Sequence, residues 1–156
     1  MTPRDKNLNP ILILMADDDE DDRMMTEQAM RKNHLANEIR FVVDGEDLMN
    51  YLNHKGEYTE DNSPTPDLIL LDLNMPKKNG MEALKEIKAE KKFKCIPIIV
   101  LTTSSAEEDI VYSYDLGVSS FITKPVTFDG LVKVVKEIDN YWFEVVKLPK
   151  TNNKDN

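Results

Sequence analysis

Short apolar runs alternate with longer amphipathic stretches along most of the chain. The runs predict strands over residues 11–16, 39–43, 67–72, 97–101 and 119–123, because short, mostly apolar segments bounded by polar residues are typical of buried strands. The amphipathic stretches predict helices over residues 19–33, 44–55, 79–88, 105–116 and 127–147, where apolar positions recur at helical spacing. Residues 56–66 have no periodicity and predict an exposed loop, longer than most connections.

Local signals mark the ends of several of these helices. Asn79 and Ser105 are each followed three positions later by a glutamate, the spacing of a capping box at a helix start. Gly117 is placed to end the fourth helix, because glycine adopts the left-handed backbone that often follows a helix. Thr127 is a capping residue for the last helix.

The regular alternation of strand and helix predicts the fold class. Five strands and five helices in turn specify a doubly wound α/β fold, with a parallel sheet and right-handed crossovers. No repeat or linker divides the 156 residues, so we expect one domain over residues 10–149. Residues 1–9 would form an N-terminal arm, and the polar residues 150–156 a disordered tail.

Composition narrows the function. Acidic residues outnumber basic ones by 29 to 20, a formal charge of −9, and no basic cluster offsets it, so a nucleic-acid-binding protein is disfavoured. The first residues lack the apolar core of a signal peptide, and no apolar run is long enough for a membrane span, which predicts a cytoplasmic protein. The single cysteine, Cys95, is expected to fill the core beside Ile96.

Polar residues follow four of the predicted strands. Asp17 and Asp18 follow the first strand, Asp72 the third, Thr102 the fourth and Lys124 the fifth. The carboxyl ends of parallel strands form the edge of a sheet where ligands bind. If these strands are neighbours, the five side chains share one edge.

Carboxylates gathered in this way need a counter-charge. At about 4 Å and an effective dielectric near 20, each pair would repel by roughly 4 kcal/mol. A divalent cation would supply this charge, and hard oxygen ligands with incomplete protein coordination favour Mg²⁺. Thr102 and Lys124 would then be free to bind the oxygens of an anion. Asp72, at the end of the most apolar strand, is the candidate nucleophile towards phosphorus and would form an aspartyl phosphate.

Several of the polar residues near these strand ends also have a purely structural interpretation. Asp19 to Asp22 are better explained as acids that favour the N-terminus of the first helix through its dipole. Thr102 alone would be an ordinary turn residue, and Lys124 alone a solvated charge at a strand end. Their combination with Asp72 at strand ends favours a binding site.

Taken together, Asp17-Asp18, Asp72, Thr102 and Lys124-Pro125, in this order, resemble the receiver domain of two-component response regulators over about residues 10–140. The resemblance implies the strand order 2-1-3-4-5 and phosphorylation of Asp72 by a histidine kinase. It also implies that the protein is no enzyme in the usual sense, since it would catalyse only its own phosphorylation and dephosphorylation.

The resemblance implies a metal site. In this family Asp18, Asp72 and the backbone carbonyl of Asn74 would bind Mg²⁺ directly, while Asp17 would act mainly through water.

The resemblance also implies a phosphoryl site and a switch. Thr102 would hydrogen-bond the phosphoryl group, Lys124 would pair with it, and the Lys124–Pro125 peptide bond would be cis. Phe121 matches an aromatic switch position whose inward rotation follows the movement of Thr102.

Two segments are similar to the regulators that partner bacterial phytochromes: the loop over residues 56–66 and the apolar ending over residues 141–149. A helix from Thr127 to about residue 147 would be roughly 30 Å long and would overhang the sheet. Its last turns would be exposed without a partner, so we expect a homodimer through an interface that includes Trp142, Phe143, Val145 and Val146. The alternative is that this segment folds back onto its own domain.

Three other functions fit parts of this pattern. A phosphatase of the haloacid dehalogenase type needs an acid two residues after the nucleophile, where this chain has Asn74. A flavodoxin-like carrier needs a hydroxyl-rich phosphate loop after its first strand, where this chain has acids. A phosphorylation-independent interaction module remains the main alternative, although it would be expected to lack part of the constellation. The expected function is that of a single-domain response regulator without an output domain, which signals through protein–protein contacts.

Overall fold

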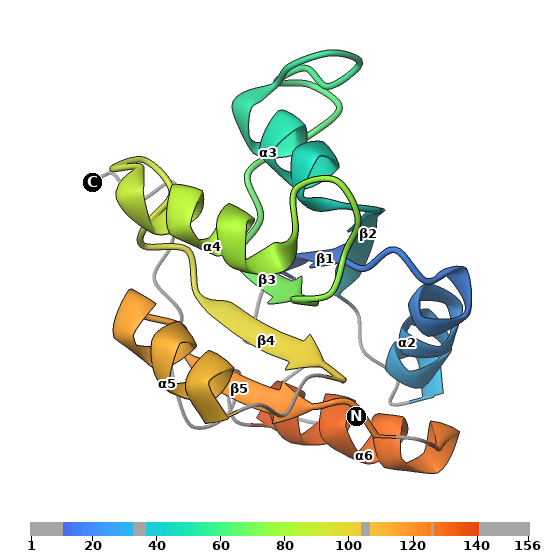
Figure 1. Ribbon diagram of the computed structural model, residues 1–156. Coiled ribbons are helices and arrows are strands. Elements are labelled where there is room, and N and C mark those ends of the chain that lie inside the picture. Colours follow the sequence, from blue (N-terminus) through green and yellow to red (C-terminus); the bar gives the residue numbers. More distant parts are fainter. Residues whose placement is uncertain (1–10, 33–36, 104–106, 126, 141–156) are drawn as a thin grey trace.

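The computed structural model describes residues 11–32, 37–103, 107–125 and 127–140. Five strands form one parallel sheet in the order β2-β1-β3-β4-β5, as expected. The strands are β1 (Leu12–Ala16), β2 (Glu38–Val42), β3 (Leu68–Leu71), β4 (Ile98–Thr102) and β5 (Ser120–Thr123). The predicted doubly wound α/β fold is therefore confirmed (Figure 1).

The helices cover both faces of the sheet. They are α2 (Glu20–Lys32), α3 (Gly45–Asn53), α4 (Gly80–Ala89), α5 (Glu107–Leu116) and α6 (Phe128–Asn140). Helices α2 and α6 pack against each other on one face, whereas α3, α4 and α5 follow one another across the other face (Figure 1). Each face has its own apolar core, and the alternate side chains of the central strands point into one core or the other.

The central strands carry much of this core. All four residues of β3 and all five of β4 are buried, because helices cover both faces of these strands. Burying a leucine or isoleucine side chain completely contributes roughly 1.5–3 kcal/mol to the stability of the fold. The side chains of these two strands therefore stabilise the centre of the sheet.

The predicted helix ends are confirmed where the structure describes them. Asn79 and Glu82 form a reciprocal capping box at the start of α4. Gly117 follows α5 with a φ of +101°, a left-handed backbone that suits glycine. The Thr127 Oγ1 accepts the N–H of Gly130 at the start of α6, at 3.0 Å. The capping box predicted at Ser105 lies outside the described residues.

Strand boundaries differ from the predicted ones by at most one residue. The β2 strand ends at Val42, and the N–H of the next residue, Val43, donates to the Asp47 side chain at 3.0 Å. The expectation for Cys95 was wrong: its side chain is exposed, while Phe93 and Ile96 of the same turn are buried.

The loop over residues 56–66 is more ordered than the sequence suggests. The hydroxyl of Tyr58 donates to the Asp47 carboxylate at 2.7 Å, and the hydroxyl of Tyr51 donates to the carbonyl of Pro64 at 2.8 Å. Ser63 is fully buried, so only part of this loop is exposed as predicted. These contacts attach the loop to α3.

Several predictions fall on residues that the structure does not describe. These are the N-terminal arm over residues 1–9, the tail over residues 150–156 and the proposed interface residues Trp142, Phe143, Val145 and Val146. Among the helices of the described ranges, none is both long and apolar enough to cross a membrane.

Candidate functional site

The ends of four strands bring the predicted polar residues to one edge of the sheet. The N–H of Asp72 donates to the carbonyl of Ala16 at 3.0 Å, which joins the end of β3 to the end of β1. The N–H of Lys124 donates to the carbonyl of Thr102 at 2.8 Å, which joins the end of β5 to the end of β4. Because these strands are parallel and in register, the side chains that follow them meet.

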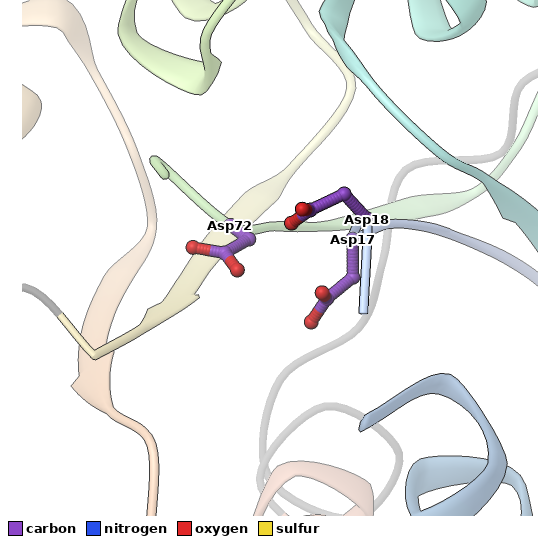
Figure 2. A group of neighbouring side chains, drawn as sticks. All are labelled: Asp17, Asp18 and Asp72. Atoms are coloured by element: carbon purple, nitrogen blue, oxygen red, sulfur yellow. The ribbon is translucent and has the colours of Figure 1, made fainter. Parts of the chain in front are cut away.

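Three carboxylates gather at this edge. One oxygen each of Asp17, Asp18 and Asp72 lie within 4.8 Å of one another, and Figure 2 shows the three groups side by side. Asp17 is 0% exposed and Asp72 is 5% exposed, whereas Asp18 is exposed to solvent. These carboxylates would supply only some of the ligands of a metal ion and leave the others to water. Such a set of hard oxygen ligands fits a cation such as Mg²⁺ or Mn²⁺.

Lys124 supplies the positive charge at this edge. Its Nζ donates to Asp17 and Asp22 at 2.6 Å each, and to Asp72 at 3.1 Å. Burial alone would lower the pKa of Lys124, but the hydrogen bonds to Asp17 and Asp22 outweigh it and raise that pKa above its ordinary value. Burial raises the pKa of Asp17, and the hydrogen bond from Lys124 opposes this shift.

The other oxygen of Asp72 is held by its own loop and by β4. Its Oδ1 accepts the hydroxyl of Thr102 at 2.7 Å and the N–H of Asn74 at 3.0 Å. The side-chain amide of Asn74 lies at the limit of hydrogen-bond distance from Thr102 Oγ1, at 3.5 Å, and from Thr103 Oγ1, at 3.4 Å. Asp72 therefore has both carboxylate oxygens oriented by hydrogen bonds.

Two glycines hold the loop that carries Asn74, and neither stood out in the sequence as part of this site. A Cβ built on Gly45 would lie 2.1 Å from the carbonyl oxygen of Lys78, and one built on Gly80 would lie 2.2 Å from the carbonyl oxygen of Asp72. The N–H of Gly45 also donates to that Lys78 oxygen at 2.8 Å. Close backbone approach of this kind requires glycine.

Asp22 is the other site residue that the sequence did not reveal. The helix dipole alone explained an acid at this position, yet its carboxylate binds the ammonium of Lys124. The available signal was topological, because the N-terminus of a helix lies at the same edge of the sheet as the end of the strand before it.

Phe121 lies on β5, one strand from Thr102. Its side chain is partly buried and packs against the core on the face covered by α3 and α4. Its backbone N–H donates to the hydroxyl of Tyr114 on α5, at 3.1 Å. The Lys124–Pro125 bond differs from the expectation: no peptide bond in the described ranges is cis. The trans form is the intrinsically favoured one by about 0.5–1 kcal/mol, and Lys124 reaches the carboxylates with it.

Comparison with known proteins places this arrangement in a family. The sequence model of the family 'response regulator receiver domain' matches residues 13–136 of this chain. The chain is 41% identical over 145 residues to the response regulator Rcp1 of Synechocystis sp. (strain ATCC 27184 / PCC 6803 / Kazusa), covering 93% of this chain and 97% of that protein.

Solved structures agree with this match. The Mn²⁺-bound form of Rcp1 superposes with a TM-score of 0.82 at 41% identity, over 90% of this chain and 100% of that one. The phosphorylated form of the cyanobacterial phytochrome response regulator RcpA superposes with a TM-score of 0.84 at 41% identity, over 91% and 100% of the two chains. With the strand order and the polar edge described above, these matches show that the chain belongs to the response regulator receiver family.

Proposed function

We propose that the protein accepts a phosphoryl group on Asp72 from a phosphohistidine of a sensor kinase, in a reaction that uses Mg²⁺. The observation that carries this proposal is the convergence of a buried Asp72 with Thr102, Lys124 and two further carboxylates at one edge of the sheet. The phosphorylated form of RcpA, at 41% identity, supports the same chemistry.

The transfer is a displacement at phosphorus. An oxygen of Asp72 attacks, the bond between phosphorus and the kinase imidazole breaks, and that nitrogen keeps the electron pair and takes up a proton. Both oxygens of Asp72 are oriented before this step, Oδ1 by Thr102 and Asn74 and Oδ2 by Lys124. Lys124 and Thr102 then contact the oxygens of the bound phosphoryl group.

Asp18, Asp72 and the backbone carbonyl of Asn74 would hold the metal directly, with Asp17 acting mainly through water. When bound, a divalent cation offsets the charge of the carboxylates and of the incoming phosphoryl oxygens. The Mn²⁺-bound form of Rcp1 supports a divalent cation, and we propose Mg²⁺ because it retains waters and accepts phosphate oxygens.

The partners follow from the family and from the named relatives. We infer that the protein is cytoplasmic and that its partner is a sensor histidine kinase, specifically a phytochrome, because RcpA is a phytochrome response regulator. Phosphorylation would move Thr102, and Phe121 on the next strand would follow, which changes the surface offered to other proteins. A homodimer through Trp142, Phe143, Val145 and Val146 stays a prediction from the sequence.

Intact-mass analysis after incubation with acetyl phosphate and Mg²⁺ tests the proposal. We expect one phosphoryl group on the native chain, none on Asp72→Asn and none in the presence of a chelator. Asp67→Asn is the matched control, since Asp67 precedes the same strand at its opposite end and Asn can still accept the N–H of Leu12.

An unchanged mass for the native chain, or equal labelling of Asp72→Asn, would remove the proposal. In that case the phosphorylation-independent interaction module would be the better description.

A further inference from the structure

Lys124 holds three carboxylates at once, and one of them is outside the candidate metal site. Its ammonium has three N–H donors, which the contacts with Asp17, Asp22 and Asp72 match one for one. Asp17 and Asp72 belong to the cluster whose oxygens lie within 4.8 Å of one another, whereas Asp22 does not. Asp22 is therefore a partner for Lys124 that a cation at this cluster would leave in place.

The carboxylate of Asp22 is positioned by the first turn of α2. Its backbone N–H donates to Asp19 Oδ1 at 3.2 Å, and its carbonyl accepts the hydroxyl of Thr26 at 2.9 Å. The Asp22 side chain is 26% exposed and that of Lys124 only 9%, so water screens this ion pair less than an ordinary surface pair. A fixed acid at this distance holds the ammonium on the α2 side of the site.

A metal ion would draw on two of the carboxylates that Lys124 holds, those of Asp17 and Asp72. Lys124 donates to Oδ2 of Asp17 and to Oδ2 of Asp72, and a cation attracts both carboxylates. A buried ammonium that loses all its acceptors is strongly disfavoured. If Asp22 keeps one hydrogen bond to Lys124, the other two carboxylates can turn to the cation at lower cost.

We propose that Asp22 is a positioning residue that retains Lys124 when a divalent cation binds, and so favours metal binding without touching the metal. This inference rests on the proposed function for the identity of the metal site. The conventional explanation of Asp22 is the helix dipole, which acts equally on any acid of the first turn. Asp21 distinguishes the two explanations: it is the adjacent acid of the same turn, and the ion pairs of Lys124 among the described residues do not include it.

Isothermal titration calorimetry with MgCl₂ tests the proposal on the native chain and on Asp22→Asn, Asp21→Asn and Asp22→Glu. We expect Asp22→Asn to weaken the affinity for Mg²⁺ about three- to ten-fold more than Asp21→Asn does, the range expected for loss of one partly buried ion pair. Asp22→Glu should recover most of the affinity, because it restores a carboxylate. Thermal unfolding of all variants is measured in parallel, which separates a loss of Mg²⁺ affinity from a loss of the fold.

A second comparison asks whether Asp22 acts through Lys124. In a Lys124→Met background, the difference between Asp22→Asn and Asp21→Asn should disappear. Equal affinities for Asp22→Asn and Asp21→Asn in the native background, or a difference that persists without Lys124, would overturn the proposal. The comparison of the native-background variants decides even if Lys124→Met fails to fold.

Failure of this inference is distinguishable from failure of the proposed function. Phosphorylation of the native chain by acetyl phosphate, together with equal Mg²⁺ affinities, would overturn the role of Asp22 alone. No phosphorylation of the native chain would overturn the function, whatever the affinities show.

Discussion

Replacing Gly45 with alanine is expected to displace the loop that follows β3. Gly45 is the first residue of α3, and a Cβ there would lie 2.1 Å from the carbonyl oxygen of Lys78 and 2.7 Å from its carbonyl carbon. Both are backbone atoms, so no side-chain rotation can relieve the overlap. The loop between Asp72 and Gly80 must move away from α3, and Asn74 moves with it.

The size of the effect follows from three contributions. Overpacking against a fixed group costs typically about 1–3 kcal/mol. Loss of the 2.8 Å hydrogen bond from Gly45 to Lys78 costs about 1 kcal/mol more. Alanine regains up to about 1 kcal/mol of helix propensity. We therefore expect the free energy of unfolding to fall by about 1–3 kcal/mol. The affinity for Mg²⁺ should be several-fold weaker because the Asn74 carbonyl shifts.

Urea unfolding and calorimetric titration with MgCl₂ measure the two effects. Gly56→Ala is the matched control, because Gly56 has a φ of +67° but no heavy atom within 4 Å of the Cβ that alanine would add. It should lose about 1–2 kcal/mol through backbone strain alone and bind Mg²⁺ as the native chain does. Stability of Gly45→Ala equal to that of Gly56→Ala, together with native Mg²⁺ affinity, would refute the idea that this contact positions the loop.

Three further substitutions test individual hydrogen bonds. Tyr58→Phe removes the 2.7 Å bond to Asp47 and should lower the free energy of unfolding in urea by about 1 kcal/mol; an unchanged midpoint would mean that the loop is not held by this bond. Tyr114→Phe removes the acceptor of the Phe121 N–H, so that amide should exchange with deuterium faster in an NMR measurement, and an unchanged rate would contradict the contact. Asn79→Ala removes the cap of α4 and should cost about 1 kcal/mol in thermal or urea unfolding, whereas Asn79→Ser should cost little; equal losses for the two variants would show that the cap does not stabilise α4.

The strands and the polar edge were predictable because they depend on one-dimensional patterns. Apolar runs such as Leu68–Leu71 have no other stable environment than the interior of the sheet, and a parallel sheet then determines which strand ends meet. The convergence of Asp17, Asp72 and Lys124 followed from that topology and from the family resemblance. Their chemical roles remain proposals, since proximity alone does not establish them.

The remaining features depend on three-dimensional detail that no periodicity encodes. Asp21 and Asp22 satisfy the helix N-terminus equally well, and only the direction of the side chain decides that Asp22 reaches Lys124. The contact of Gly45 with Lys78 joins the start of α3 to the loop before α4, and this approach depends on the packing of α3 beside α4. Cys95 was misassigned because it lies in a short turn, where neither strand nor helix spacing indicates which side chain is buried.

The charges at the site bear on the order in which a metal ion and a phosphoryl group would bind. In the structure, the carboxylates of Asp17, Asp22 and Asp72 contact the ammonium of Lys124, and that of Asp18 lies beside Asp17 and Asp72. These four acids exceed the charge of Lys124, so they attract a cation and oppose an anion. Under the proposed function, a phosphoryl donor would then need further positive charge at this edge before it approaches Asp72. Lys124 cannot supply it while its three donors are engaged by Asp17, Asp22 and Asp72. Under the proposed function, metal binding comes first and frees Lys124 from Asp72, and only then is the ammonium available to a phosphoryl oxygen.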